Sequence, residues 1–189
     1  MDKKSFKKLL EERILVFDGA MGTMLQRAGL RSGECPEAYN LKHPDGIRKI
    51  HQQYAEAGCD VLQTNTFGAN PIKLAQYGLE KETASINQYA VWIAKEASDG
   101  RCLVAGDMCP SGKLMLPMGD MHFREAYRAY YEQAKALAKA GADLIHIETM
   151  SDIQEAKAAV IAAKDASDLP VICSMTYDKN LRTLAGSDP

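Results

Sequence analysis

The sequence predicts an α/β fold of the (β/α)8, or TIM-barrel, type, and it supplies about the first five β/α units of such a barrel. Three observations carry this prediction. Short apolar runs alternate with amphipathic segments, one helix-to-strand junction occurs twice, and no Gly-x-Gly-x-x-Gly or Walker motif follows a strand. The first two are typical of a parallel sheet covered by helices, and the third argues against a nucleotide-binding doubly wound sheet.

Five runs rich in β-branched or apolar residues mark the expected strands. They are Ile14–Phe17, Val61–Thr64, Cys102–Ala105, Leu144–Ile147 and Val171–Met175. Since a complete barrel has eight strands in roughly 250 residues, a chain of 189 residues falls three strands short. The final Ser187-Asp188-Pro189 has the N-cap and the proline of a helix start, so we expect the chain to stop inside a barrel. Residues 1–189 are thus expected to form a single, partial domain.

Between the strands, apolar residues recur at spacings of three and four, which predicts amphipathic helices that cover a core. The clearest stretch runs from Phe123 to Ala138 and is followed by Gly141 as a stop signal. Others lie at 47–57, 86–97 and 153–163. The junctions AEAGCDVLQTN and AKAGADLIHIE repeat an alanine-rich helix end, a glycine, an aspartate and a strand, as stacked β/α units would.

The composition argues against several function classes. The formal net charge of −2 gives no reason to expect nucleic acid or an acidic membrane surface as a partner, and no segment approaches the roughly 20 apolar residues of a membrane span. The charged start, MDKKSFKKLLEER, lacks the apolar stretch of a signal peptide and is interpreted as a solvated helix face. Five scattered cysteines without a Cys-x-x-Cys pair indicate free thiols in a reducing cytoplasm.

The ends of the predicted strands carry the candidate site, because the loops after the carboxyl ends of barrel strands build the active site. Three carboxylates are expected on one rim: Asp18, Asp107 and Glu148. Asp18 and Glu148 are suited to an ammonium group. The backbone N–H groups of Gly19–Gly22, at a helix start, are suited to a carboxylate. The rim is therefore expected to hold an amino acid by its two charged ends.

Several of these residues also have a purely structural interpretation. An Asp-Gly pair after a strand, such as Asp18-Gly19, is a simple turn about as often as it is part of a binding site. Asp107 can likewise cap a turn. His146 shares strand parity with Glu148 and so faces the same interior, but a lone strand histidine is more typical of a hydrogen-bonded core residue than of a catalytic one. The methionines that follow the strands are expected to line a pocket mouth rather than to bind metal.

Five motifs, in order, resemble one known family: FDGAMGTMLQ, GCDVLQTNTFGAN, GDMCPSGKLM, GADLIHIETMSD and VICSMTYDKNLRTLAGSDP. They are similar to the homocysteine-binding domain of cobalamin-dependent methionine synthases and, more widely, to the homocysteine S-methyltransferase family. The resemblance covers nearly the whole chain. It implies a (β/α)8 barrel that binds homocysteine and zinc at the strand carboxyl ends. Zinc favours the thiolate, the nucleophilic form of sulfur, which takes a methyl group from methylcobalamin on another domain to give methionine.

The resemblance also assigns substrate contacts residue by residue. Asp18 and Glu148 correspond to acids that contact the substrate amino group. The other contacts are the backbone of Gly19 and Ala20 and the pocket-wall residues Asn65, Thr66 and Phe67. The family's zinc is held by three cysteine thiolates, one at the end of strand six and an adjacent pair near strand eight. None of the five cysteines occupies a matching position, so the resemblance implies no catalytic residue and no metal ligand here, and we expect the chain to be inactive alone.

Two other hypotheses stay open on the sequence. One is a non-catalytic half-barrel that dimerises or assembles with a partner chain, because an open five-stranded sheet exposes two edges. The other is an unrelated barrel lyase or aldolase, although no strand ends in a lysine suited to Schiff-base chemistry and no phosphate loop is visible.

Overall fold

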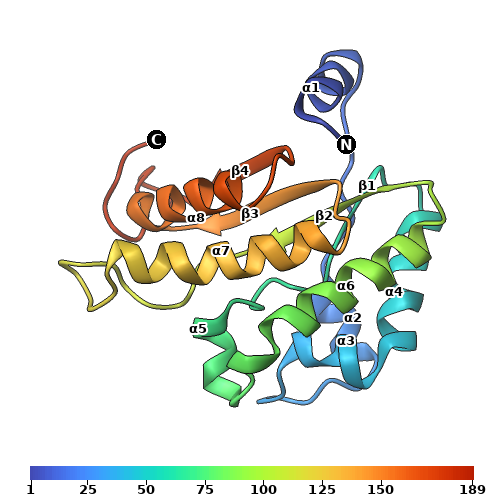
Figure 1. Ribbon diagram of the computed structural model, residues 1–189, viewed down its shortest axis with the longest axis horizontal. Helices are drawn as coiled ribbons and strands as arrows, with labels where there is room; N and C mark the ends of the chain where they lie inside the picture. The colour runs from blue at the N-terminus through green and yellow to red at the C-terminus, as the bar shows by residue number, and fades with distance from the viewer.

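The computed structural model describes residues 1–189 and shows one parallel four-stranded sheet in the order β1-β2-β3-β4 (Figure 1). The strands are β1 (Val61–Gln63), β2 (Leu103–Met108), β3 (Leu144–Met150) and β4 (Val171–Met175). The register pairs Val61 with Leu103, Ala105 with Leu144, and Ile145 with Val171. Because all pairs are parallel, the carboxyl ends of the strands meet at one edge of the sheet.

Four α-helices precede β1, and the other four connect the strands. The longer ones are α1 (Lys3–Glu12), α4 (Pro44–Glu56), α6 (Thr83–Ser98), α7 (Phe123–Lys139) and α8 (Ile153–Ala166). Shorter ones are α2 (Met21–Arg27), α3 (Tyr39–Lys42) and α5 (Pro71–Leu74). The four helices expected from apolar periodicity are confirmed as α4, α6, α7 and α8. No helix follows β4, so the helix start expected at Ser187 stays a prediction, and no helix has the length and apolar character to cross a membrane.

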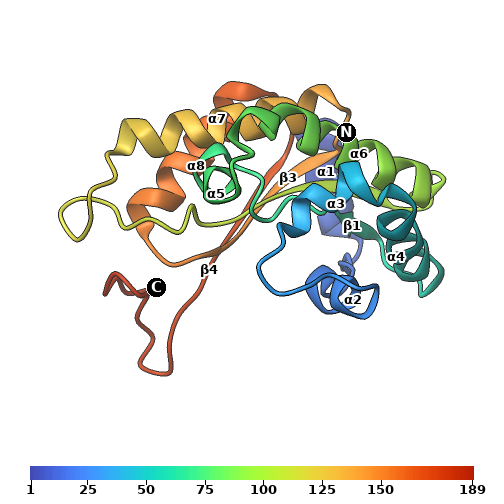
Figure 2. The same cartoon turned by 90° about the horizontal axis from the view of Figure 1, so that it is seen from below.

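Helices α6, α7 and α8 lie along one face of the sheet, as Figures 1 and 2 show. Their apolar stripes pack against the strand side chains that point toward them, and this interface holds the largest cluster of buried residues. Tyr130 and Leu137 of α7 and Ile145 of β3 are fully buried there. Gly106 of β2 is required at the closest approach, because a Cβ at this position would lie 3.0 Å from the Leu137 side chain.

The opposite face of the sheet is lined by the alternate strand residues, since successive side chains point to opposite faces. Near the amino ends of the strands, Val61, Ala105 and Leu144 form a small apolar cluster with Phe6 of α1. Phe6 is the one buried residue of α1. Helix α1 thus closes this end of the face with a single side chain and is otherwise a solvated helix, as expected.

The expected first strand, Ile14–Phe17, is wrong, because the segment forms only a single parallel bridge between Phe17 and Val61. The Val61 N–H donates to the Val16 carbonyl at 3.2 Å, but the Val16 N–H donates to the Asp60 carboxylate instead of a main-chain carbonyl. Ile14 is 88% exposed at this edge. The sheet therefore has four strands and not the five that the apolar runs predict.

Phe6→Ala is expected to lower the free energy of unfolding by about 3 kcal/mol, because truncating a buried phenylalanine costs about 3–5 kcal/mol and Phe6 is 5% exposed. Urea denaturation followed by circular dichroism measures the change. Leu10→Ala on the same helix is the matched control, since Leu10 is 50% exposed and exposed positions usually change stability by less than about 0.5 kcal/mol. Equal losses in the two variants would contradict the role given to Phe6.

Candidate functional site

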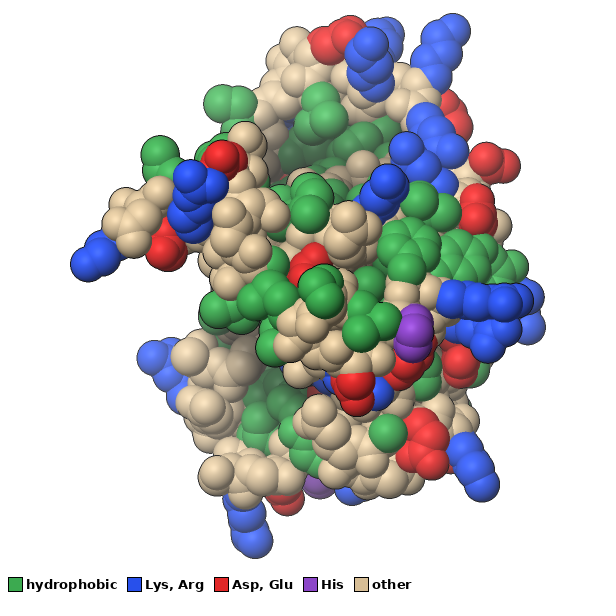
Figure 3. Space-filling model, turned by 90° about the vertical axis from the view of Figure 1, so that its left-hand side faces the viewer, with side chains coloured by type: hydrophobic (Ala, Val, Ile, Leu, Met, Phe, Trp, Pro, Cys, Tyr) green, Lys and Arg blue, Asp and Glu red, His purple; other side chains and the backbone are tan.

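A cavity of about 400 Å³ opens at the carboxyl ends of the strands. Its walls come from the loop that leads into α2, from the end of β1 and the loop after it, and from the ends of β2 and β3. The lining residues are Asp18, Gly19, Ala20, Met21, Gly22, Gln63, Thr64, Asn65, Phe67, Asp107 and Glu148. Figure 3 views the molecule from the side toward which β3 runs, and the surface there is hollowed, with hydrophobic side chains in the hollows.

Asp18 lies on the cavity wall directly after the bridge to β1. Its Oδ2 accepts a hydrogen bond from the Gln63 N–H at 3.1 Å, whereas its Oδ1 is buried and has no partner. Burial raises the pKa of Asp18 to about 7, the hydrogen bond from Gln63 opposes this, and the Glu148 carboxylate adds a smaller increase. A positively charged ligand would restore the ionised state of Asp18.

Asp107 is the last inward-pointing residue of β2 and is 4% exposed. Its Oδ1 has no hydrogen-bond partner. Burial first, and then the neighbouring Glu148 and Asp18, raise the pKa of Asp107 well above its usual range. Oxygen atoms of Asp107 and Glu148 and a ring nitrogen of His146 lie within 4.8 Å of one another. Since carboxylates this close repel each other when ionised, the cavity favours a cation.

A β-bulge sets the position of Glu148. The register between β3 and β4 shifts between Ile147 and Met150, and Thr149 has a φ of 59°, a left-handed conformation that β-branched residues rarely adopt. The Thr149 hydroxyl donates to Glu148 Oε2 at 3.1 Å, and the Thr149 N–H donates to Ser174 Oγ at 3.4 Å. Backbone strain of this kind is common at ligand sites. The bulge holds Glu148 beside the other two carboxylates.

His146 and Gln63 form a polar pair across the inner face of the sheet. His146 Nδ1 contacts Gln63 Oε1, and the Phe17 ring packs 5.2 Å from the imidazole centroid. Burial lowers the pKa of His146, although Glu148 opposes this effect. The imidazole is therefore neutral near pH 7, and its Nδ1–H donates to Gln63. Because the Gln63 oxygen is engaged, the amide NH₂ remains for the cavity that Gln63 lines.

In the segment Thr64–Phe67, the TNTF motif, some residues line the cavity and one does not. Asn65 and Phe67 line the cavity, and Phe67 is 38% exposed. Thr66 is fully buried, and its hydroxyl donates to the Asp107 carbonyl at 2.7 Å. The structure thus places Thr66 beneath the wall, where it fixes β2, and not on the cavity surface.

Gly19 and Ala20 line the cavity with main-chain atoms just before α2. Neither residue donates its backbone N–H to another group of the chain. The Ala20 carbonyl accepts a hydrogen bond from the Tyr54 hydroxyl of α4 at 3.0 Å. A Cβ at Gly19 would lie 2.9 Å from the Tyr54 ring, so any other residue here would displace that ring and its hydroxyl. Both N–H groups are available to a ligand.

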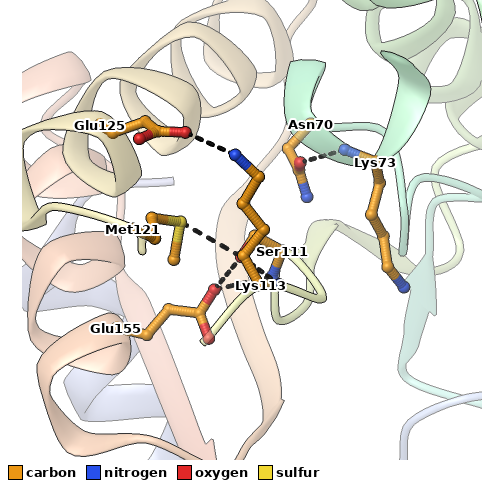
Figure 4. A network of polar contacts seen from close by, with 7 residues as sticks. All are labelled: Asn70, Lys73, Ser111, Lys113, Met121, Glu125 and Glu155. Atoms are coloured by element: carbon orange, nitrogen blue, oxygen red, sulfur yellow. Dashed lines mark hydrogen bonds and ion pairs between the residues drawn. The ribbon is translucent and has the colours of Figure 1, made fainter. Parts of the chain in front are cut away.

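The loop after β2 is held by a buried glutamate of α8, shown in Figure 4. Glu155 accepts hydrogen bonds from the Ser111 N–H at 2.8 Å, the Ser111 hydroxyl at 2.5 Å and the Tyr130 hydroxyl at 2.8 Å. Nearer the surface, Lys113 forms an ion pair with Glu125 of α7 at 2.9 Å. None of these residues lines the cavity. This part of the GDMCPSGKLM motif therefore fixes the loop after β2 without lining the cavity.

The five cysteines are free thiols, and none of them lines the cavity. The donors around it are carboxylates, amides, hydroxyls and a nearby imidazole, which differ from the three thiolates that the resemblance implies for zinc. Residues 1–189 therefore do not fit the family's zinc site.

Residues 15–189 match the homocysteine S-methyltransferase family, and this match decides the family of the chain. The chain belongs to this family. It is 34% identical to the methionine synthases of Mycobacterium leprae and Mycobacterium tuberculosis. The two alignments span 196 and 197 residues, respectively, and each covers 95% of the chain. The chain spans 16% of the length of these two relatives. Membership rules out the unrelated barrel lyase or aldolase.

Solved structures of the homocysteine methyltransferase MmuM from Escherichia coli share the fold. The oxidized form has a TM-score of 0.82 at 24% identity, covering 95% of this chain and 68% of the MmuM chain. The metallated form has a TM-score of 0.81 at 24% identity, covering 96% and 69%. At this level of identity the likeness shows the fold alone. It confirms the α/β architecture of the barrel type expected from the sequence.

Gln63 is a site residue that sequence reasoning missed, whereas Asp107 was expected on the rim but was given no substrate contact. The sequence signal that points to both residues is their position in the alternation of inward and outward side chains along a strand. Gln63 shares the parity of Val61, and Asp107 shares that of Ala105, and both Val61 and Ala105 lie in the inner apolar cluster. The alternation that places His146 inside the sheet therefore also places these two residues at the cavity.

Raising the pH from about 4.5 to about 8 is expected to destabilise the wild-type chain through Asp18. The Asp18→Asn variant is expected to lose less stability over the same pH range. The folded chain keeps the Asp18 proton up to about pH 7, whereas an unfolded aspartate releases it near pH 4. The folded state thus binds more protons between these values, and the stability this confers disappears as pH rises through them. Asparagine cannot ionise, so the variant should lose less stability, by an amount on the order of 2 kcal/mol.

Urea denaturation at both pH values measures this difference. The control is Asp168→Asn, because the Asp168 carboxylate is fully exposed and its replacement should preserve the wild-type pH dependence. An Asp18→Asn variant with the same pH dependence as wild type would show that Asp18 ionises normally in the folded chain.

Proposed function

We propose that the cavity binds homocysteine and that the chain acts as the homocysteine-binding part of an S-methyltransferase that forms methionine. The observation that carries this proposal is a pair of buried carboxylate oxygens, Asp18 Oδ1 and Asp107 Oδ1, that have no partner and belong to residues lining one cavity. Buried acceptors without a partner are costly, so a ligand with matching donors gains affinity by satisfying them. Family membership supports homocysteine as the amino acid.

The substrate ammonium group is proposed to lie among Asp18, Asp107 and Glu148. A primary ammonium has three N–H donors and a positive charge, and the three carboxylates supply acceptors at one end of the cavity. Hydrogen bonds between ionised partners in a partly buried site are stronger than neutral ones. Because the bound cation favours the ionised carboxylates, binding lowers the pKa of Asp18 from about 7 and releases a proton near neutral pH.

The substrate carboxylate is proposed to accept hydrogen bonds from the N–H groups of Gly19 and Ala20, which have no acceptor within the chain. Asn65 and Phe67 form the wall along the carbon chain, and Thr66 supports that wall from below through the Asp107 carbonyl. Held at both charged ends, the amino acid keeps its thiol as the group left to react.

The reactive chemistry is proposed to come from groups outside residues 1–189. Zinc bound by cysteines elsewhere would favour the substrate thiolate, and methylcobalamin on another domain would be the methyl donor. Two observations support this division: the cavity has no thiolate ligand, and the chain spans only 16% of the methionine synthases that it matches.

Glu148→Gln is expected to weaken homocysteine binding by at least about 30-fold, since removing one partner of a charged hydrogen bond costs about 2 kcal/mol or more. Isothermal titration calorimetry with reduced homocysteine measures the affinity. The analogue 4-mercaptobutanoate lacks the amino group and should bind the wild-type chain at least about 30-fold more weakly than homocysteine, for the same reason.

The matched control is Glu125→Gln, because Glu125 pairs with Lys113 at the surface and does not line the cavity. It should bind homocysteine with wild-type affinity. An unchanged affinity in Glu148→Gln, or equal binding of 4-mercaptobutanoate and homocysteine, would contradict the site. A folded wild-type chain that binds no homocysteine would contradict the proposed function.

We also propose that residues 1–189 are the first β/α units of a barrel that a longer polypeptide completes. The chain spans 68% of the oxidized MmuM structure that shares its fold. The intact mass of the protein from its native source should therefore exceed 20.7 kDa, and the added residues should include the zinc-binding cysteines. A native mass of 20.7 kDa would favour the half-barrel hypothesis instead.

A further inference from the structure

Two thiols lie side by side at the amino ends of β1 and β2. Cys59 precedes β1 and Cys102 precedes β2, and their Sγ atoms are 3.9 Å apart. The Cys102 thiol also donates to the Cys59 carbonyl at 3.2 Å. The parallel register, which pairs Val61 with Leu103, brings these segments together. The proximity is thus built into the sheet.

The other three cysteines have different surroundings. Cys35 donates to Glu37 and Cys109 to the Pro110 carbonyl, whereas the thiol of the exposed Cys173 forms no hydrogen bond. No other two cysteine sulfurs of the chain lie within contact distance. A reaction that needs two thiols can therefore occur within the folded chain only at Cys59 and Cys102.

We infer that Cys59 and Cys102 are a modification site, at which a two-electron oxidant such as hydrogen peroxide forms an intramolecular disulfide between β1 and β2. The sulfurs must approach from 3.9 Å to about 2.0 Å. Cys59 is half-buried in the loop after Gly58, and Cys102 is buried in a small cluster with Leu62, against which Cys59 packs. No other side chain has to be displaced from between the two sulfurs, because they are already in contact.

The reaction balances in two steps. The Cys59 sulfur attacks one peroxide oxygen, the O–O bond breaks, and the products are a sulfenic acid on Cys59 and one water. The Cys102 sulfur then attacks the Cys59 sulfur, the S–O bond breaks, and the hydroxyl leaves as a second water with the Cys102 proton. Two thiols are oxidised and one peroxide is reduced to two waters.

We expect the pair to oxidise slowly at neutral pH. Burial, followed by the adjacent Cys102 thiol, raises the pKa of Cys59 to about 12, and the Asp18 and Asp60 carboxylates add to this. The thiolate is the attacking form, so brief exposure to peroxide leaves both residues reduced, whereas sustained exposure closes the disulfide. This separates the pair from fast peroxide sensors, whose cysteines have a lowered pKa.

The disulfide would close a loop of the chain that contains β1, the TNTF motif and α6. Its two ends lie at the amino side of the sheet, opposite the cavity. It therefore stabilises the fold without entering the candidate site, and the inference is independent of the proposed function. From loop closure alone, we expect the melting temperature to rise by roughly 5–10 °C.

The test uses the full chain with Cys173→Ser, which removes the exposed thiol and with it cross-links between molecules. After prolonged hydrogen peroxide treatment and removal of the oxidant, free thiols are counted under denaturing conditions with Ellman's reagent. The count should fall by two per chain, the monomer mass should fall by that of two hydrogens, and dithiothreitol should reverse both changes. Peptide mapping should find Cys59 joined to Cys102.

Cys59→Ser and Cys102→Ser in the same background are the controls, and each should lose the disulfide and the rise in melting temperature. If these variants fail to fold, N-ethylmaleimide labelling of the parent chain gives the same answer, because oxidation should protect only Cys59 and Cys102. A thiol count that does not fall by two, protection of a different cysteine pair, or stable sulfinic acid on Cys59 would overturn the inference.

Discussion

The parallel pairing of β2 with β1 and β3 is the constraint on which the rest of the structure depends. The register lines up inward-pointing residues of three strands, first the apolar cluster around Phe6 and then the polar side chains at the cavity. A slip of one residue in β2 would turn Asp107 into the helix interface and bring Met108 into the cavity. The close contact of Gly106 with Leu137 fixes the register from the other face.

The buried carboxyl groups of the cavity destabilise the protein when no ligand is bound. Asp18 and Asp107 are held in surroundings where ionisation is difficult, and an oxygen atom on each is left without a partner. Such groups lower the stability of the empty fold, and a cationic ligand offsets the cost. On the proposed function, recognition of the amino acid therefore lies within these residues, whereas activation of its sulfur needs thiolates that are absent from the cavity.

Much of this arrangement could be predicted from the sequence because it follows from local periodicity. The four amphipathic helices, four of the five strands and the position of Glu148 at the rim all have this origin. The failures have non-local causes. The run Ile14–Phe17 is as apolar as a strand, but only its last residue forms a bridge to β1. The contact of Gln63 with His146 joins residues 83 positions apart, which no single-segment pattern reveals. The buried position of Thr66 depends on an acceptor in another strand.

Tyr54 touches the loop before α2 in two ways, and this has an evolutionary consequence. Its ring leaves no room for a Cβ at position 19, and its hydroxyl fixes the carbonyl of Ala20. A side chain at position 19 would require a smaller residue at position 54, yet that residue would release the loop. A side chain at position 19 alone would push the Tyr54 ring aside, and a smaller residue at position 54 alone would lose the bond to Ala20, so the cost of either change depends on the other. Positions 19 and 54 are therefore epistatic, and descendants of this sequence should retain both residues or exchange them together.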